Sequence, residues 1–118
     1  MEKVDLSILP ENLRKQVVFL SNEPAWRKDF AKQVIESLSK LGFAVLGIEL
    51  WMPEGDVPRV IGWSEYNIEY SGDWGDYVQK NLEFAMRDIE RVTEENVLFN
   101  LTWVSPNEVE DNRKLPQS

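Results

Sequence analysis

The chain has 118 residues, 42% of them hydrophobic, which is enough for one domain of ordinary size with a single core. It contains no cysteine and no histidine, so composition excludes disulfides, thiolate or imidazole metal sites, and Ser-His-Asp or Cys-His catalysis. The formal net charge of −8 opposes binding to nucleic acid and to anionic membranes and favours a cationic partner, although such a charge is also ordinary for a soluble protein.

Residues 1–42 predict two helices and no targeting segment. No apolar run is long enough for a signal peptide or a membrane span, so we expect a cytoplasmic protein. Apolar spacing predicts a short helix near residues 10–20, although its last four residues are equally compatible with a strand. A second helix follows, with Ser21 or Asn22 as its cap, Pro24 in its first turn and Gly42 at its end. Its apolar stripe comprises Trp26, Phe30, Val34, Leu38 and Leu41.

From Phe43 the apolar period changes to two, which predicts a strand near residues 43–52. The even-numbered positions, from Ala44 to Met52, are continuously apolar and are expected to meet the helices. Turn-forming residues 52–58 then lead to a second, antiparallel strand near residues 59–66.

The rest of the chain predicts one more helix and one more strand. Asp73 is placed to cap a helix near residues 74–92, with Asp76 in its first turn. A third strand near residues 97–104 is apolar on both faces, so we expect it inside the sheet. Three tryptophans fall on the predicted buried stripes and are assigned to the core: Trp26, Trp74 and Trp103.

Together these elements predict the α+β fold class, in the order α-α-β-β-α-β. We expect a small, mainly antiparallel sheet of three to four strands, packed against two or three helices. Residues 1–105 would form this single domain, and residues 106–118 a polar tail that we expect to be mobile.

An acidic and aromatic segment spans residues 43–77. It holds seven acidic and seven aromatic residues against a single base, Arg59. Trp51 is the best candidate for an exposed anchor and Trp63 is comparable, although completion of the core would explain both rings equally well. Exposed aromatic rings flanked by acids suit a protein interface with a basic partner. The expected contact surface comprises Glu49, Trp51, Glu54, Asp56, Trp63, Glu65, Tyr66 and Glu69.

Other chemistries have weaker support in the sequence. Glu49, Glu65 and Glu69 could meet on neighbouring strands as the acid and base of a glycosidase, or the rings could stack on sugars, but solvated carboxylates are the simpler explanation. Neither the pair Asp73 and Asp76 nor residues 54–56 match a calcium loop, so no metal is expected. The glycines are scattered and form no phosphate-binding loop, so no cofactor is expected either.

Several motifs resemble a known bacterial family. Residues 22–29 (NEPAWRKD), residues 38–51 (LSKLGFAVLGIELW), residues 63–65 (WSE) and residues 73–78 (DWGDYV) are similar to the pattern of the immunity protein 40 family of polymorphic-toxin systems. The resemblance implies a protein without enzymatic activity that binds its cognate toxin domain and blocks it. A basic toxin would suit the acidic segment, and a general interaction adaptor without a toxin is the remaining alternative.

Overall fold

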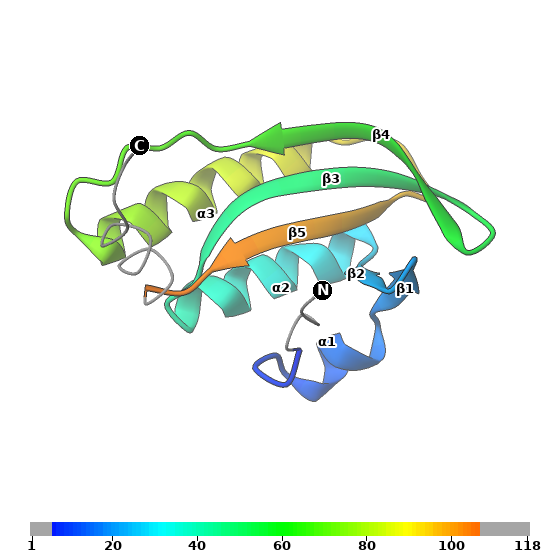
Figure 1. Ribbon diagram of the computed structural model, residues 1–118, viewed down its shortest axis with the longest axis horizontal. Helices are drawn as coiled ribbons and strands as arrows, with labels where there is room; N and C mark the ends of the chain where they lie inside the picture. Colours follow the sequence, from blue (N-terminus) through cyan, green and yellow to red (C-terminus); the bar gives the residue numbers. More distant parts are fainter. Residues whose placement is uncertain (1–5, 107–118) are drawn as a thin grey trace, which may run out of the picture.

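The computed structural model describes residues 6–106 and confirms the α+β fold class and the expected element order (Figure 1). A small β1–β2 hairpin is added between the first two helices. Of the polar tail expected at residues 106–118, the part from residue 107 onward lies outside the described residues. The elements are α1 (Glu11–Lys15), β1 (Val18–Leu20), β2 (Glu23–Ala25), α2 (Lys28–Lys40), β3 (Ala44–Glu54), β4 (Val57–Glu65), α3 (Trp74–Arg91) and β5 (Leu98–Val104).

The main sheet has the order β4-β3-β5, and both pairings are antiparallel. The expectation that β5 lies inside the sheet is therefore wrong, because β3 is the central strand. Both faces are covered at the start of β5, since Leu98 packs in the cluster with Trp51 whereas Phe99 packs in the main core, but Thr102 farther along the strand is exposed. Its outer edge is occupied at Phe99, because Trp26 and Phe99 exchange two backbone hydrogen bonds, of 3.0 and 2.7 Å.

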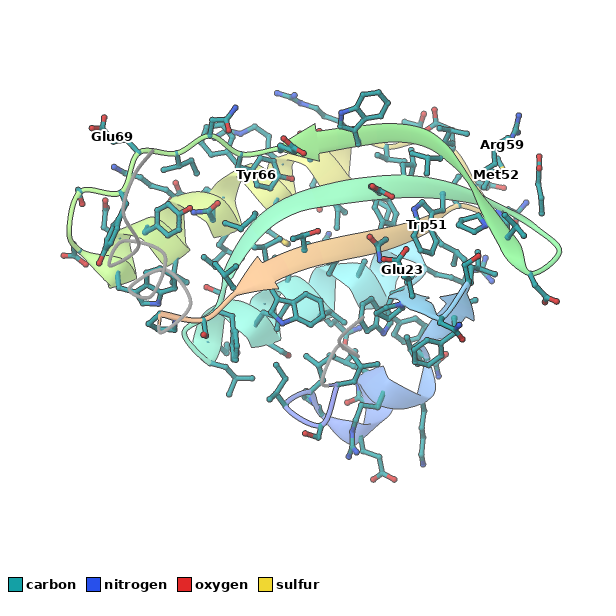
Figure 2. The ribbon with its side chains drawn as sticks, viewed as in Figure 1. Glu23, Trp51, Met52, Arg59, Tyr66 and Glu69 are labelled. Carbon is teal, nitrogen blue, oxygen red and sulfur yellow. The ribbon has the colours of Figure 1, made fainter. Side chains whose placement is uncertain are left out.

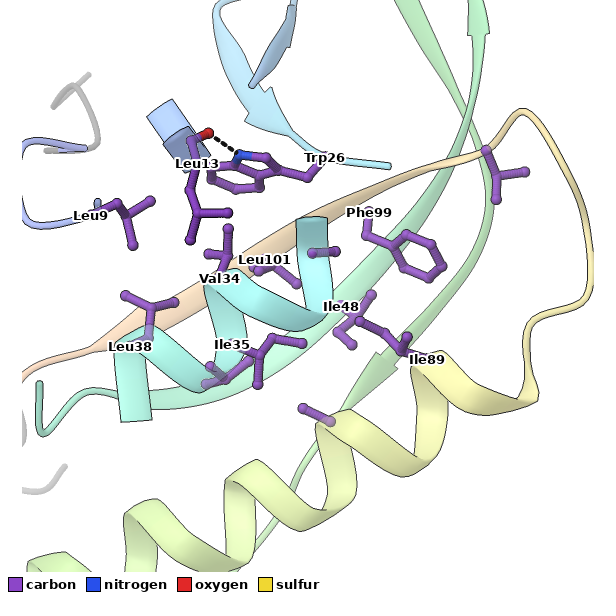
Figure 3. Close-up of a cluster of buried hydrophobic side chains, with 14 residues drawn as sticks. Leu9, Leu13, Trp26, Val34, Ile35, Leu38, Ile48, Ile89, Phe99 and Leu101 are labelled. Carbon is purple, nitrogen blue, oxygen red and sulfur yellow. Dashed lines mark hydrogen bonds between the residues drawn. The ribbon is translucent and has the colours of Figure 1, made fainter. Parts of the chain in front are cut away.

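Helices α2 and α3 lie together on one face of the sheet, where they enclose the main core (Figure 3). Helix α2 ends as expected: Gly42 has a positive φ of 87°, and the N–H of Phe43 donates to the carbonyl of Leu38 at 2.9 Å. Helix α3 begins as expected, because the Asp73 side chain accepts a hydrogen bond of 3.0 Å from the N–H of Asp76.

The start of α2 differs from the prediction. The helix begins at Lys28, and Ser21 and Asn22 form instead the two-residue turn between β1 and β2, with φ of 51° and 66°. Ser and Asn serve both as helix caps and in such turns, so the local sequence alone does not separate the two outcomes. Trp26 lies between β2 and α2 rather than on the helix. Its ring is buried, and its indole N–H donates to the carbonyl of Leu13 at 3.0 Å, which ties α1 to the core (Figure 3).

The alternation of side chains between the two faces of β3 is interrupted near its start. Its register with β5 is interrupted between Val45 and Gly47, so Val45 and Ile48 both reach the main core although they differ in parity. The expected apolar face at the even-numbered positions is therefore interrupted at its start, and it is regular only beyond Gly47.

Candidate partner-binding surface

Trp51, the expected exposed anchor, is buried. Its side chain is 1% exposed and packs with Leu20, Ala25 and Leu98 beneath the β1–β2 hairpin (Figure 2). Its indole N–H donates to the Glu49 carboxylate at 2.9 Å. A surface-anchor role for Trp51 is therefore wrong, and the ring belongs to a second, smaller core.

Trp63 is the exposed tryptophan of the β3–β4 hairpin, with 74% of its surface accessible. It lies directly opposite Glu49 in the antiparallel register, and cross-strand partners project from the same side of a sheet. Because Trp51 fixes the Glu49 carboxylate from one side, the structure brings an oriented acid and a free indole together on the face that the helices leave uncovered.

Side-chain exposure alternates with each residue from Ile61 to Tyr70, with the odd-numbered positions exposed. The hydroxyl of Tyr66 donates to Asp88 of α3 at 2.8 Å, so the even-numbered positions face the helices. Burial, together with this hydrogen bond, raises the pKa of the Tyr66 phenol well above its ordinary value. Tyr66 is therefore half-buried and fastens the chain to α3, rather than being an open contact residue. The exposed side chains, which we term the outer row, are Ile61, Trp63, Glu65, Asn67 and Glu69.

The predicted acidic residues divide into two groups at the two ends of this segment. Glu54 and Asp56 are exposed near the β3–β4 turn, where Glu54 pairs with Arg59 at 3.0 Å and the Asp56 carbonyl accepts the N–H of Ser21. Glu69 lies at the other end (Figure 2). Within residues 6–106, no ion pair engages Glu49, Glu65 or Glu69. These three carboxylates, together with that of Asp56, which is exposed and in none of those ion pairs, are the predicted negative charges open to a partner.

Strand β4 also carries exposed apolar side chains that the sequence reasoning missed. Val57, Val60 and Ile61 are 60%, 46% and 40% exposed, and none of the nine residues of β4 is buried. The reason is architectural: α3 packs chiefly against β3, and α2 against β3 and β5. The alternation of β4 predicts a strand, but it carries no information on whether a helix lies beneath that strand.

Two hollows adjoin β4. The larger, of about 340 Å³, is lined by Glu49, Trp63, Glu65 and Tyr66 among others, and so gathers four of the predicted contact residues. The smaller, of about 230 Å³, lies between β4 and α3 and is lined mostly by Leu50, Gly62, Val92 and Phe99, with Asp88 and Arg91 at the helix. Small residues at helix-facing positions of β4, such as Gly62 and Ser64, leave this second groove unfilled.

The hairpin that ends in the β3–β4 turn is irregular toward its tip. Pro53 and Pro58 lie opposite each other, and Ile61 is an extra residue between the pairs Trp51–Val60 and Leu50–Gly62. The extra residue therefore divides the pairing of β4 into two regular stretches, residues 57–60 toward the turn and residues 62–65, which include Trp63 and Glu65.

The described residues offer neither a metal site nor a membrane-spanning helix. Among residues 6–106, no group of three or more acidic side chains is arranged to hold a metal ion. No helix in that part of the chain is long and apolar enough to span a membrane. Comparison with known proteins found no matching family model, curated protein or solved structure.

Proposed function

We propose that this protein is an immunity protein, which binds a cognate bacterial toxin domain through the outer row and Glu49 and thereby neutralises it. The observation that carries the proposal is β4, a strand of the main sheet with no buried residue and with Val57, Val60, Ile61 and Trp63 exposed. Several large apolar side chains exposed along one strand are a feature of surfaces that a partner covers. The sequence resemblance to toxin-immunity proteins agrees with this role.

The charges next to Trp63 favour a basic partner. Glu49, Glu65 and Glu69 have no ion-pair partner within residues 6–106, and Glu49 and Glu65 line the same hollow as Trp63. Carboxylates around an exposed aromatic ring accelerate association with a positively charged protein and orient it, while the ring supplies apolar area. Inhibition then requires no catalysis, since it is sufficient that the bound protein blocks the toxin's active site or another surface essential to its activity.

The test uses the C-terminal domain encoded by the gene adjacent to this one, because immunity proteins are encoded beside their toxins. Expression of that domain alone is expected to arrest bacterial growth, and co-expression of this chain is expected to restore it. The two purified proteins should also form a stable complex in size-exclusion chromatography. Continued arrest together with the absence of a complex would reject the proposal and favour a general adaptor.

A carbohydrate-binding or glycosidase function is the second candidate, because the hollow of about 340 Å³ contains two carboxylates, Glu49 and Glu65, beside the indole of Trp63. Rings that stack on sugars and paired acids are the groups that such sites use. Titration with mono- and oligosaccharides, followed by tryptophan fluorescence in the wild type and in Trp63→Phe, separates this candidate from the first. Saturable quenching that the variant loses would support it.

A further inference from the structure

The outer edge of β4 is open for strand addition. β4 is the last strand on its side of the sheet, and within residues 6–106 no other strand pairs with that edge. The opposite edge, on β5, is occupied at Phe99, which exchanges backbone hydrogen bonds with Trp26. An edge strand presents a row of unpaired backbone N–H and C=O groups, which an extended segment of another protein can use.

The groove between β4 and α3 lies directly beside this edge. Its lining residues Leu50 and Phe99 belong to the main core, and they are reachable because Gly62 and Ser64 above them are small. Side chains of a strand alternate between two faces. A strand added to β4 would therefore direct one set of side chains over the outer row, next to Ile61 and Trp63, and the other set toward the groove.

The geometry points to an extended segment of the partner that adds to β4 as a further strand, with apolar side chains in the β4–α3 groove, Lys or Arg opposite Glu65, and a further basic side chain beyond the strand near Glu69. This inference rests on the proposed function, which identifies the partner as the toxin domain. Pro58 offers no N–H, so we expect the added strand to begin beyond it and to pair with residues 60–67, with the extra residue Ile61 accommodated as a bulge.

Charge favours a toxin segment over a second copy of this chain. From Glu54 to Glu69 the segment contains four acids and one base, and the charge of that base, Arg59, is already matched by Glu54. Pairing of two copies would bring together two segments that are each net negative, which is unfavourable, whereas a basic segment would be attracted to Glu65 and Glu69.

The experiment combines hydrogen–deuterium exchange with substitutions at Gly62. In the complex with the C-terminal domain of the adjacent gene product, exchange of amides in residues 60–67 should slow relative to the free protein, because new backbone hydrogen bonds form there. A Cβ at Gly62 would lie 3.9 Å from Leu50 Cβ, an ordinary contact, so the fold can accept a side chain that fills the groove. Gly62→Val should weaken binding by about tenfold or more, with an unchanged or higher unfolding midpoint, and Gly62→Ala by only about twofold.

The matched control is Leu41→Ala, which removes an exposed apolar side chain at the end of α2 and should leave affinity unchanged. A complex whose amides at 60–67 exchange as in the free protein, or whose affinity Gly62→Val leaves unchanged, overturns strand addition while the immunity function stands. Failure of the toxin domain to bind at all overturns both. Protection of the same amides in the free protein at high concentration, with a dimeric mass, assigns the edge to a second copy and overturns the partner proposed here.

Discussion

Glu49 on β3 and Trp63 on β4 are cross-strand partners on the sheet face that the helices do not cover. The carboxylate is held by the buried Trp51, whereas the indole of Trp63 is 74% exposed. The two tryptophans of the hairpin therefore differ in environment: Trp51 is part of a buried cluster, whereas Trp63 is accessible on the surface.

Trp63→Ala should accelerate dissociation of the toxin complex without harming the fold. The side chain is mostly solvated, so we expect the free energy of unfolding to change by no more than about 0.5 kcal/mol. A ring that becomes buried in a complex should cost about 2 kcal/mol or more of binding free energy when it is removed. Surface plasmon resonance gives the dissociation rate, and chemical denaturation gives the stability. An unchanged dissociation rate would remove Trp63 from the interface.

Trp51→Ala, unlike Trp63→Ala, should strongly reduce the free energy of unfolding. Removal of a fully buried indole leaves a cavity among Leu20, Ala25 and Leu98, and we expect a loss of about 3–5 kcal/mol in the free energy of unfolding. Trp51→Phe retains part of the apolar contact but not the hydrogen bond to Glu49. Its free energy of unfolding should therefore lie between those of the wild type and Trp51→Ala. Denaturant titration of the three proteins provides the comparison, and a loss below about 1 kcal/mol for the alanine variant would contradict burial of the ring.

Glu65→Lys combined with Glu69→Lys should slow association with a basic toxin domain and weaken its dependence on ionic strength. The reason is that long-range attraction by exposed charges acts on the association rate and is screened by salt. Asp29→Lys combined with Glu36→Lys makes the same change in net charge on the exposed side of α2, and serves as the control. Stopped-flow association rates at several salt concentrations decide the point. Equal effects of the two double variants would mean that only the overall charge matters.

Tyr66→Phe tests the link between the end of β4 and α3. Because the folded-state pKa of Tyr66 is raised above its ordinary value of 10.0, the folded protein retains a proton that the unfolded chain loses in alkali. The contribution of Tyr66 to stability is thus complete below about pH 10 and declines above it. Substitution by Phe should cost about 1 kcal/mol at neutral pH and should reduce the fall in stability above pH 10. Unfolding free energies measured across that pH range check both statements, and a tyrosinate signal from Tyr66 in mild alkali would contradict the burial.

The sequence predicts well those features that local chemistry decides. Asp73 and Asp76 define the start of α3, and Gly42 defines the end of α2, because capping depends on a few adjacent residues. The β1–β2 hairpin was missed because Ser21 and Asn22 suit a cap and a tight turn equally. The burial of Trp51 follows from that hairpin and so could not be foreseen. The exposure of Val60 and Trp63 depends on where α3 packs, which the alternation within β4 does not encode.

The irregular end of the β3–β4 hairpin has a protective consequence. A strand with an open edge and exposed valines and tryptophan would ordinarily be a template for edge-to-edge aggregation. Pro53, Pro58 and the extra residue Ile61 shorten the stretch on which another chain can align, to a length that one partner strand can fill. We therefore expect the prolines and the bulge to limit edge-to-edge pairing between copies of this protein, although the strand itself carries exposed apolar side chains.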